Sequence, residues 1–82
     1  MPYDYFRSER FKKEYKKLDR RQQELVDKKI LKIAENPKLG KPLHAPLQNF
    51  KSERMEKLRI IYALQGKIIK FAWIDDRGHV YG

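Results

Sequence analysis

The 82-residue chain contains no cysteine, only two histidines and only four glycines. The absence of cysteine excludes disulfides and thiolate metal sites, and it is typical of proteins in a reducing cytoplasm. His44 and His79 are far apart in the chain and belong to no helical His pair, so we expect no metal site. The glycines are too scattered to form a phosphate-binding loop, and neither serine has a nucleophile-elbow context. No cofactor is therefore expected.

Long apolar segments are also missing. No segment approaches the roughly 18 residues that cross a membrane, and the N-terminus lacks the apolar stretch of a signal peptide. We therefore expect a cytoplasmic protein with no membrane partner. The length fits one small domain over residues 1–82, which leaves no room for two catalytic lobes or a doubly wound nucleotide-binding sheet.

Acidic residues are scarce relative to basic ones. Twenty Lys and Arg against 11 Asp and Glu give a net charge of +9. The densest block, over 7–32, has mixed signs, so the simpler interpretation is a solvated helical surface with pairs such as Glu9–Lys13. The functional interpretation is a positive field that attracts a polyanion, either nucleic acid or an acidic protein.

A short strand over 3–6 and two adjacent helices are predicted in the first half of the chain. Ser8 is the expected N-cap of the first helix. Asp19 is the expected N-cap of the second helix, where it forms a capping box with Gln22. Asn36-Pro37 ends the second helix. Apolar residues recur at helical spacing in both segments: Phe11, Tyr15 and Leu18, then Leu25, Val26, Ile30, Ile33 and Ala34. Helices joined so tightly are expected to form an antiparallel hairpin.

The second half predicts an antiparallel sheet that follows a Pro- and Leu-rich connector over 36–48. The leucines of this connector are expected to pack under the sheet. Two alternating segments flank Gln65-Gly66, where glycine supplies the positive φ of a two-residue turn. This turn pairs Leu58 with Trp73 on an apolar face that packs on the helices. The expected fold class is α+β: an N-terminal strand, an antiparallel helical hairpin and a small, mainly antiparallel, twisted β-sheet.

Two arginines are expected to face each other on the side of the sheet away from the helices. A tight turn around Glu56-Lys57 places Arg54 opposite Arg59, and like charges in that position are unfavourable unless an anion bridges them. Arginines bind phosphates and stabilise the charge that grows during phosphoryl transfer. Metal-free RNA cleavage needs little more than such cations and a Tyr, His, Glu or Lys that takes the 2′-hydroxyl proton. The simpler interpretation is that the arginines only solvate an open face.

In the order of its elements and in its residues, the chain resembles the RelE/ParE superfamily of toxin–antitoxin toxins over nearly its whole length. The residues that carry the resemblance are Gly40-Lys41-Pro42-Leu43, Leu47, Ser52-Glu53-Arg54, Lys57–Tyr62, Ile74, Arg77, Val80 and Tyr81. The resemblance implies a cytoplasmic toxin held inactive by a cognate acidic antitoxin. RelE-like members cut mRNA on the ribosome without metal, which inhibits translation.

The resemblance also implies roles for single residues. Arg59 matches the arginine that stabilises the phosphorane, Arg54 the arginine before the turn, and Arg77 the late arginine. Tyr81 matches the C-terminal tyrosine proposed as the base, and His79 or Glu53 are alternative bases. The expected nucleic-acid contacts are Lys51, Lys57, Lys70 and His79.

Three departures from the family pattern bear on activity. The Lys-x-Lys pair of the mRNA-cutting branch falls near Phe50 and Ser52, where only Lys51 lies. Asp76 stands where many relatives have His, and Glu56 replaces the usual turn glycine. Two other functions therefore stay open: a ParE-like toxin that acts on DNA gyrase by protein contact, and a non-catalytic basic binding module.

Overall fold

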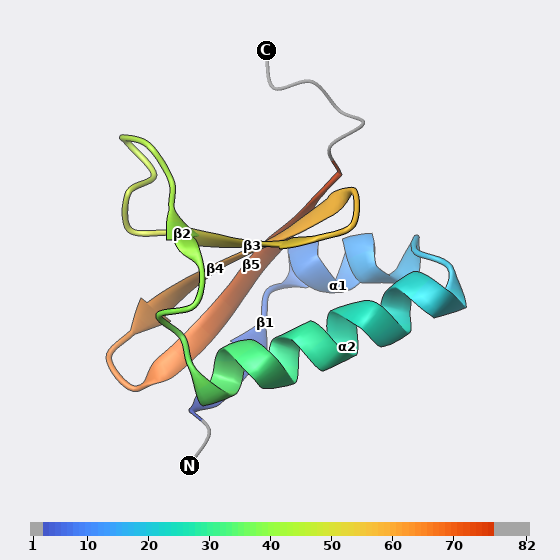
Figure 1. The fold of residues 1–82 in the computed structure, drawn as a ribbon, viewed down its shortest axis with the longest axis horizontal. Helices are drawn as coiled ribbons and strands as arrows, with labels where there is room; N and C mark the ends of the chain where they lie inside the picture. Colours follow the sequence, from blue (N-terminus) through green and yellow to red (C-terminus); the bar gives the residue numbers. More distant parts are fainter. Residues whose placement is uncertain (1–2, 77–82) are drawn as a thin grey trace.

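The fold is a five-stranded sheet with a pair of helices on one side, seen in the computed structural model, which describes residues 3–76 (Figure 1). The strand order is β1-β5-β4-β3-β2; β1 runs parallel to β5 and every other neighbouring pair is antiparallel. This confirms the predicted α+β class. Within the described part, no helix is long and apolar enough to span a membrane. The elements are β1 (Asp4–Arg7), α1 (Glu9–Lys16), α2 (Arg20–Glu35), β2 (Lys41–Pro42), β3 (Lys51–Met55), β4 (Leu58–Gln65) and β5 (Ile68–Asp76).

Both helices begin at the predicted caps. The Ser8 Oγ accepts a hydrogen bond from the Phe11 N–H at 3.0 Å. Asp19 and Gln22 form the reciprocal capping box, with the Gln22 N–H donating to the Asp19 carboxylate at 2.7 Å. The second helix ends at Asn36, and α2 runs back alongside α1 as the hairpin predicts (Figure 1).

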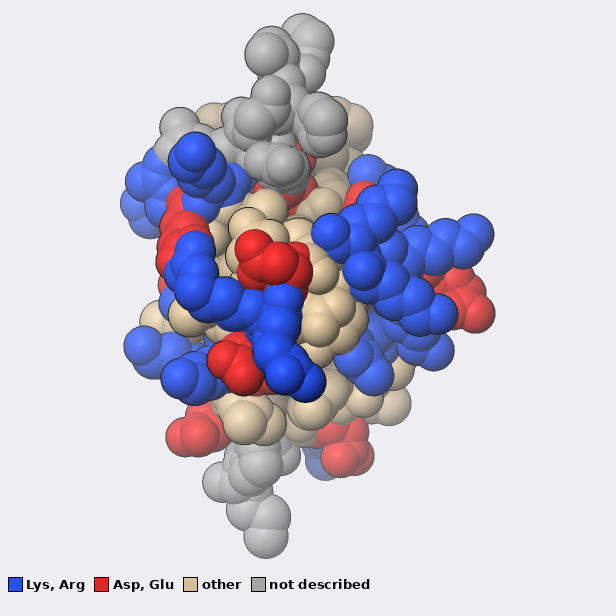
Figure 2. Space-filling view, turned by 90° about the vertical axis from the view of Figure 1, so that its right-hand side faces the viewer, with Lys and Arg blue, Asp and Glu red and all other residues tan. Residues whose placement is uncertain are grey.

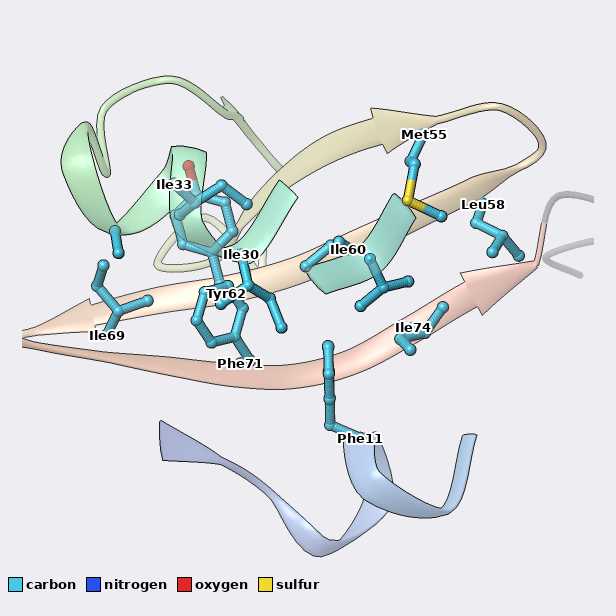
Figure 3. Close-up of a cluster of buried hydrophobic side chains, with 12 residues drawn as sticks. Phe11, Ile30, Ile33, Met55, Leu58, Ile60, Tyr62, Ile69, Phe71 and Ile74 are labelled. Carbon is cyan, nitrogen blue, oxygen red and sulfur yellow. The ribbon is translucent and has the colours of Figure 1, made fainter. Parts of the chain in front are cut away.

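The core lies between the helices and one face of the sheet (Figure 3). Phe11 of α1 points at the sheet, Ile30 and Ile33 come from α2, and Tyr62 and Phe71 lie side by side on β4 and β5. These side chains are almost fully buried, so the apolar helical stripes predicted from the sequence do form the helical half of the core.

The β4–β5 turn is one residue further along than predicted. Its central residues are Gly66 and Lys67, and Gly66 has the positive φ of 64° that the turn needs. Tyr62 therefore pairs with Phe71. The prediction of the turn glycine is confirmed, whereas the predicted register of the hairpin is wrong by two.

A β-bulge changes the faces of β5 beyond this point. Tyr62 pairs with Phe71 but Ile61 pairs with Trp73, so Ala72 is an extra residue without a cross-strand partner. Trp73 consequently lies opposite Ile61, on the face away from the core, and Ile74 enters the core in its place. The prediction that Trp73 packs against the helices is therefore wrong, because alternation alone does not reveal an inserted residue.

The connector between α2 and β3 is ordered, but its leucines do not pack under the sheet. Leu39 and Leu47 are 38% and 40% exposed, and Leu43 is half-buried. The connector instead adds the short strand β2, in which Lys41 pairs with Ser52. The main chain of the connector, rather than its leucines, is what joins it to the sheet.

Ion pairs join much of the basic helical surface to acidic neighbours. Arg10 pairs with Glu14 at 3.2 Å, and Glu9 pairs with Lys12 at 3.8 Å rather than with the predicted Lys13. Figure 2 shows one side of the molecule, where Lys and Arg form two groups with acidic side chains among and between them. A mixed, solvated surface is thus what the helices present, and exposed pairs of this kind stabilise little.

Candidate nucleic-acid interface on the open sheet face

Arg54 of β3 and Arg59 of β4 are directly opposite each other, as predicted. By strand alternation both lie on the face of the sheet away from the helices, because their neighbours Met55, Leu58 and Ile60 are in the core. Arg54 is exposed and Arg59 is half-buried. Among the side chains described within residues 3–75, no ion pair involves either guanidinium, although Asp75 lies opposite Arg59 on the neighbouring strand.

The turn that joins these two strands is held by an ion pair with α2. Glu56 has a φ of 56°, the left-handed region that favours glycine. Its carboxylate accepts two hydrogen bonds from Arg21, at 2.6 and 3.0 Å, and these bonds lower the pKa of Glu56. The glutamate that replaces the usual turn glycine therefore has a structural role, which is to tie the Arg54–Arg59 end of the sheet to the first turn of α2.

A cleft of about 500 Å³ lies beside the arginine pair, between β3 and the connector. Its walls combine several cationic side chains with apolar ones and one carboxylate. The lining residues are Leu39, Lys41, Pro42, Leu43, His44, Ser52, Glu53, Arg54 and Arg59. Lys41 and His44 were not predicted as site residues; Lys41 is part of the motif that carries the family resemblance, but no sequence signal marks His44, which the β2–β3 pairing brings to the cleft.

A buried tyrosine fixes the wall of this cleft. The Tyr62 hydroxyl donates to the Pro37 carbonyl at 2.9 Å and accepts from the Gly40 N–H at 2.8 Å. Burial raises the pKa of Tyr62, so the phenol stays neutral. A Cβ on Gly40 would lie 2.6 Å from the Tyr62 hydroxyl oxygen and 2.9 Å from the Ser52 carbonyl oxygen, so close approach requires glycine there.

The other predicted basic contacts are spread over the fold. Lys51 pairs with Tyr62, which places it on the helical side rather than near the arginine pair as predicted. Lys57 is exposed in the β3–β4 turn, and Lys70 pairs with Ala63 on the open face, toward the other end of the sheet.

The predicted acid–base groups are only partly described. Glu53 lies at the cleft, but its carboxylate accepts a hydrogen bond from Lys29 of α2 at 3.3 Å. Arg77, His79 and Tyr81 lie outside the described residues. Of the predicted site residues, the structure therefore brings together Arg54, Arg59 and Glu53, and the carboxylate of Glu53 is already bonded to Lys29.

Asp75 is a site neighbour that the sequence did not reveal. It pairs with Arg59 across β4 and β5, it is 8% exposed, and its Oδ2 has no hydrogen-bond partner among the side chains described within residues 3–75. The bulge at Ala72 causes this placement, because the same turn without the bulge would put Ile74 opposite Arg59. In the described part of the chain, no group of three His, Asp or Glu side chains is arranged to hold a metal ion.

Comparison with known proteins gives structural neighbours but no sequence relatives. No family model and no curated protein matches the chain. A chain of the RelBE2 toxin–antitoxin complex from Mycobacterium tuberculosis superposes with a TM-score of 0.85 at 22% identity, covering 94% of this chain and 100% of that one. The isolated E. coli RelE toxin superposes with a TM-score of 0.79 at 20% identity, covering 95% of this chain and 87% of that one. YafQ from E. coli strain BL21(DE3) superposes with a TM-score of 0.71 at 19% identity, covering 98% of this chain and 99% of that one. The chain therefore has the fold of RelE and YafQ.

Proposed function

We propose that this protein is the toxin of a type II toxin–antitoxin system and acts as a metal-independent, ribosome-dependent mRNA endonuclease that inhibits translation. The observation that carries the proposal is the Arg54–Arg59 pair. The two arginines are directly opposite each other on neighbouring strands and line one cleft, and among the side chains described within residues 3–75 neither is in an ion pair. Such a pair is suited to a phosphate, and the surrounding fold is that of RelE and YafQ.

The proposed chemistry is an in-line attack by the 2′-hydroxyl of the substrate. Its oxygen bonds to the adjacent phosphorus, the bond from phosphorus to the 5′-oxygen breaks, and the products are a 2′,3′-cyclic phosphate and a free 5′-hydroxyl. Arg59 and Arg54 donate hydrogen bonds to the non-bridging oxygens, whose negative charge grows in the phosphorane. A general base takes the 2′-hydroxyl proton, and a general acid protonates the leaving oxygen.

The base is best sought among groups other than Glu53. Because the Glu53 carboxylate is bonded to Lys29 on the helical side, it would have to break that ion pair to reach the cleft. Tyr81 and His79 keep their predicted roles as bases. His44, which is exposed and lines the cleft, is a further candidate for acid–base work.

The partners follow from the same proposal. The protein would bind the ribosome and mRNA in the cytoplasm, and a cognate acidic antitoxin would keep it inactive. The net charge of +9 supports both a polyanionic substrate and an acidic inhibitor.

The test is primer extension on mRNA recovered from programmed ribosomes incubated with the purified protein. We expect cuts at defined codon positions, and a loss of about 10²–10³-fold in rate for Arg59→Ala. The matched control is Arg20→Ala, an exposed arginine at the start of α2. If no cuts appear, or if both variants cut equally, the nuclease assignment is wrong.

One observation favours a second candidate, a ParE-like toxin that acts on DNA gyrase without nuclease activity. The only lysine near the expected Lys-x-Lys pair, Lys51, lies on the helical side of the sheet. Inhibition of gyrase supercoiling by the purified protein, in the absence of mRNA cuts, would select this alternative.

A further inference from the structure

An aromatic pair lies on the open face of the sheet, with Trp73 one row of residues away from Arg54 and Arg59 and Phe50 four residues before Arg54. The ring centroids of Phe50 and Trp73 are 5.4 Å apart, with an angle of 54° between the ring planes. The guanidinium of Arg10 lies over the Trp73 ring, 5.0 Å from its centroid. Both rings are half-buried and Arg10 is exposed, so this group is open to a ligand and has no part in the cleavage step described above.

The bulge at Ala72 is what brings Trp73 to this face. Without the extra residue, Trp73 would continue the alternation of Ile69 and Phe71 and enter the core. The irregular backbone has a dedicated partner, since the Ser8 hydroxyl donates to the Ala72 carbonyl at 2.6 Å. A large indole gains most from burial in a core, and bulges that aim a side chain elsewhere are common beside functional sites. The fold thus holds Trp73 at the surface.

The spacing between the aromatic pair and the arginines suits one nucleotide. Trp73 is opposite Ile61, and the arginine row begins two residues further along the same face, at Arg59. Two residues along a strand span about 7 Å. A phosphate bound at Arg54 and Arg59 would therefore place a neighbouring base over the aromatic pair.

We propose that Trp73, Phe50 and Arg10 form a stacking platform for an unpaired nucleobase of single-stranded RNA. The adjoining phosphate contact rests on the proposed function, whereas the stacking does not depend on catalysis. Aromatic faces and guanidinium planes stack on every base, and a bound strand gains affinity from each base that stacks. The platform therefore holds the substrate strand without selecting its sequence.

The test uses the fluorescence of Trp73, which is the only tryptophan of the chain. The full chain is titrated with a short 2′-O-methyl oligoribonucleotide, which lacks the nucleophilic hydroxyl, and with an abasic oligonucleotide of equal charge. We expect the base-bearing strand to quench Trp73 and to bind about ten-fold more tightly than the abasic strand. Equal quenching and equal affinity for the two strands would overturn the stacking.

Two variants check the platform independently. Phe50→Leu keeps an apolar side chain but removes a ring, and Arg10→Gln removes the cation over Trp73. Each is expected to weaken binding of the base-bearing strand, Phe50→Leu by about ten-fold. Phe50→Leu leaves the affinity for the abasic strand unchanged, whereas Arg10→Gln, which removes one positive charge, weakens the binding of both strands but that of the base-bearing strand more. Tyr3→Leu, at an aromatic residue 37% exposed beside the end of α2, is the control. Wild-type affinity in both variants would contradict the platform.

The outcomes separate this inference from the proposed nuclease. Quenching by the base-bearing strand with no cleavage on programmed ribosomes would support the platform and reject the nuclease. Cleavage that proceeds while RNA leaves Trp73 fluorescence unchanged would reject the platform and keep the nuclease. Quenching by an acidic partner protein but not by RNA would identify a protein contact and reject the platform.

Discussion

Tyr62→Phe removes one oxygen atom from the centre of the fold and is the sharpest test of how the cleft is held. The substitution keeps the ring, which is fully buried between Phe71 and the connector. It removes the donor to the Pro37 carbonyl and the acceptor of the Gly40 N–H. Both Pro37 and Gly40 are buried, so water does not readily replace the lost partner.

The magnitude follows from these two bonds. Each contributes about 1 kcal/mol net, and a buried group left without a partner costs about 1–3 kcal/mol. We expect a loss of roughly 2–4 kcal/mol in the free energy of unfolding. For a domain of this length, that corresponds to a fall of roughly 10–25 °C in Tm. The loss is a large part of the ~4–12 kcal/mol that a chain of this size usually has.

Urea unfolding followed by far-UV circular dichroism measures the loss, with an unchanged m-value as the sign that only stability has changed. Tyr5→Phe is the matched control, because the Tyr5 side chain is 42% exposed and its hydroxyl makes no hydrogen bond within residues 3–76. A loss below about 0.5 kcal/mol for Tyr62→Phe, or an equal loss in the control, would refute the reasoning.

Three further predictions concern the residues that hold the cleft and the β3–β4 turn. Gly40→Ala should cost about 1–3 kcal/mol in urea unfolding, and less in the Tyr62→Phe background, because the closest atom to the new Cβ is then gone; equal costs in both backgrounds would contradict the contact. The raised pKa of Tyr62 means that the neutral phenol is favoured in the fold, so its contribution to stability is complete below about pH 10 and is lost as pH rises through the raised folded pKa. The Tm values of wild type and Tyr62→Phe should therefore converge at alkaline pH. A Tm difference that stays constant with pH would contradict this contribution. The lowered pKa of Glu56 gives the opposite pH dependence: its contribution to stability is present above its ordinary pKa and is lost as pH falls through the lowered folded pKa. The Tm difference between wild type and Glu56→Gln should therefore shrink on acidification. A constant difference would rule out the ion pair with Arg21 as its source.

Local signals predicted a large part of this fold. Caps such as Ser8 and Asp19 act on neighbouring backbone groups, so their residue types and spacing were enough to place both helix starts. The Arg54–Arg59 pairing followed from a tight turn and a buried face, which fix register over a short distance. These features depend on residues that are close in the chain.

Features that depend on distant residues escaped the sequence. The bulge at Ala72 is supported by Ser8, far away in the chain, and it sent Trp73 to the open face and Asp75 opposite Arg59. The alternation of apolar and polar residues along one strand does not reveal where an extra residue is inserted. The role of Tyr62 was likewise hidden, because a tyrosine in an apolar strand gives no sign of which main chain its hydroxyl will meet.

The most direct test of the central claim is the single-turnover rate of mRNA cleavage by Arg59→Ala on programmed ribosomes, measured beside the affinity of that variant for the same complex. An arginine that stabilises the phosphorane acts more strongly in the transition state than in the ground state. We therefore predict that the rate falls by about 10²–10³-fold while the affinity changes far less. Equal losses in rate and affinity would show that Arg59 only anchors a phosphate, and an unchanged rate would contradict the assignment of the open sheet face as the site of cleavage.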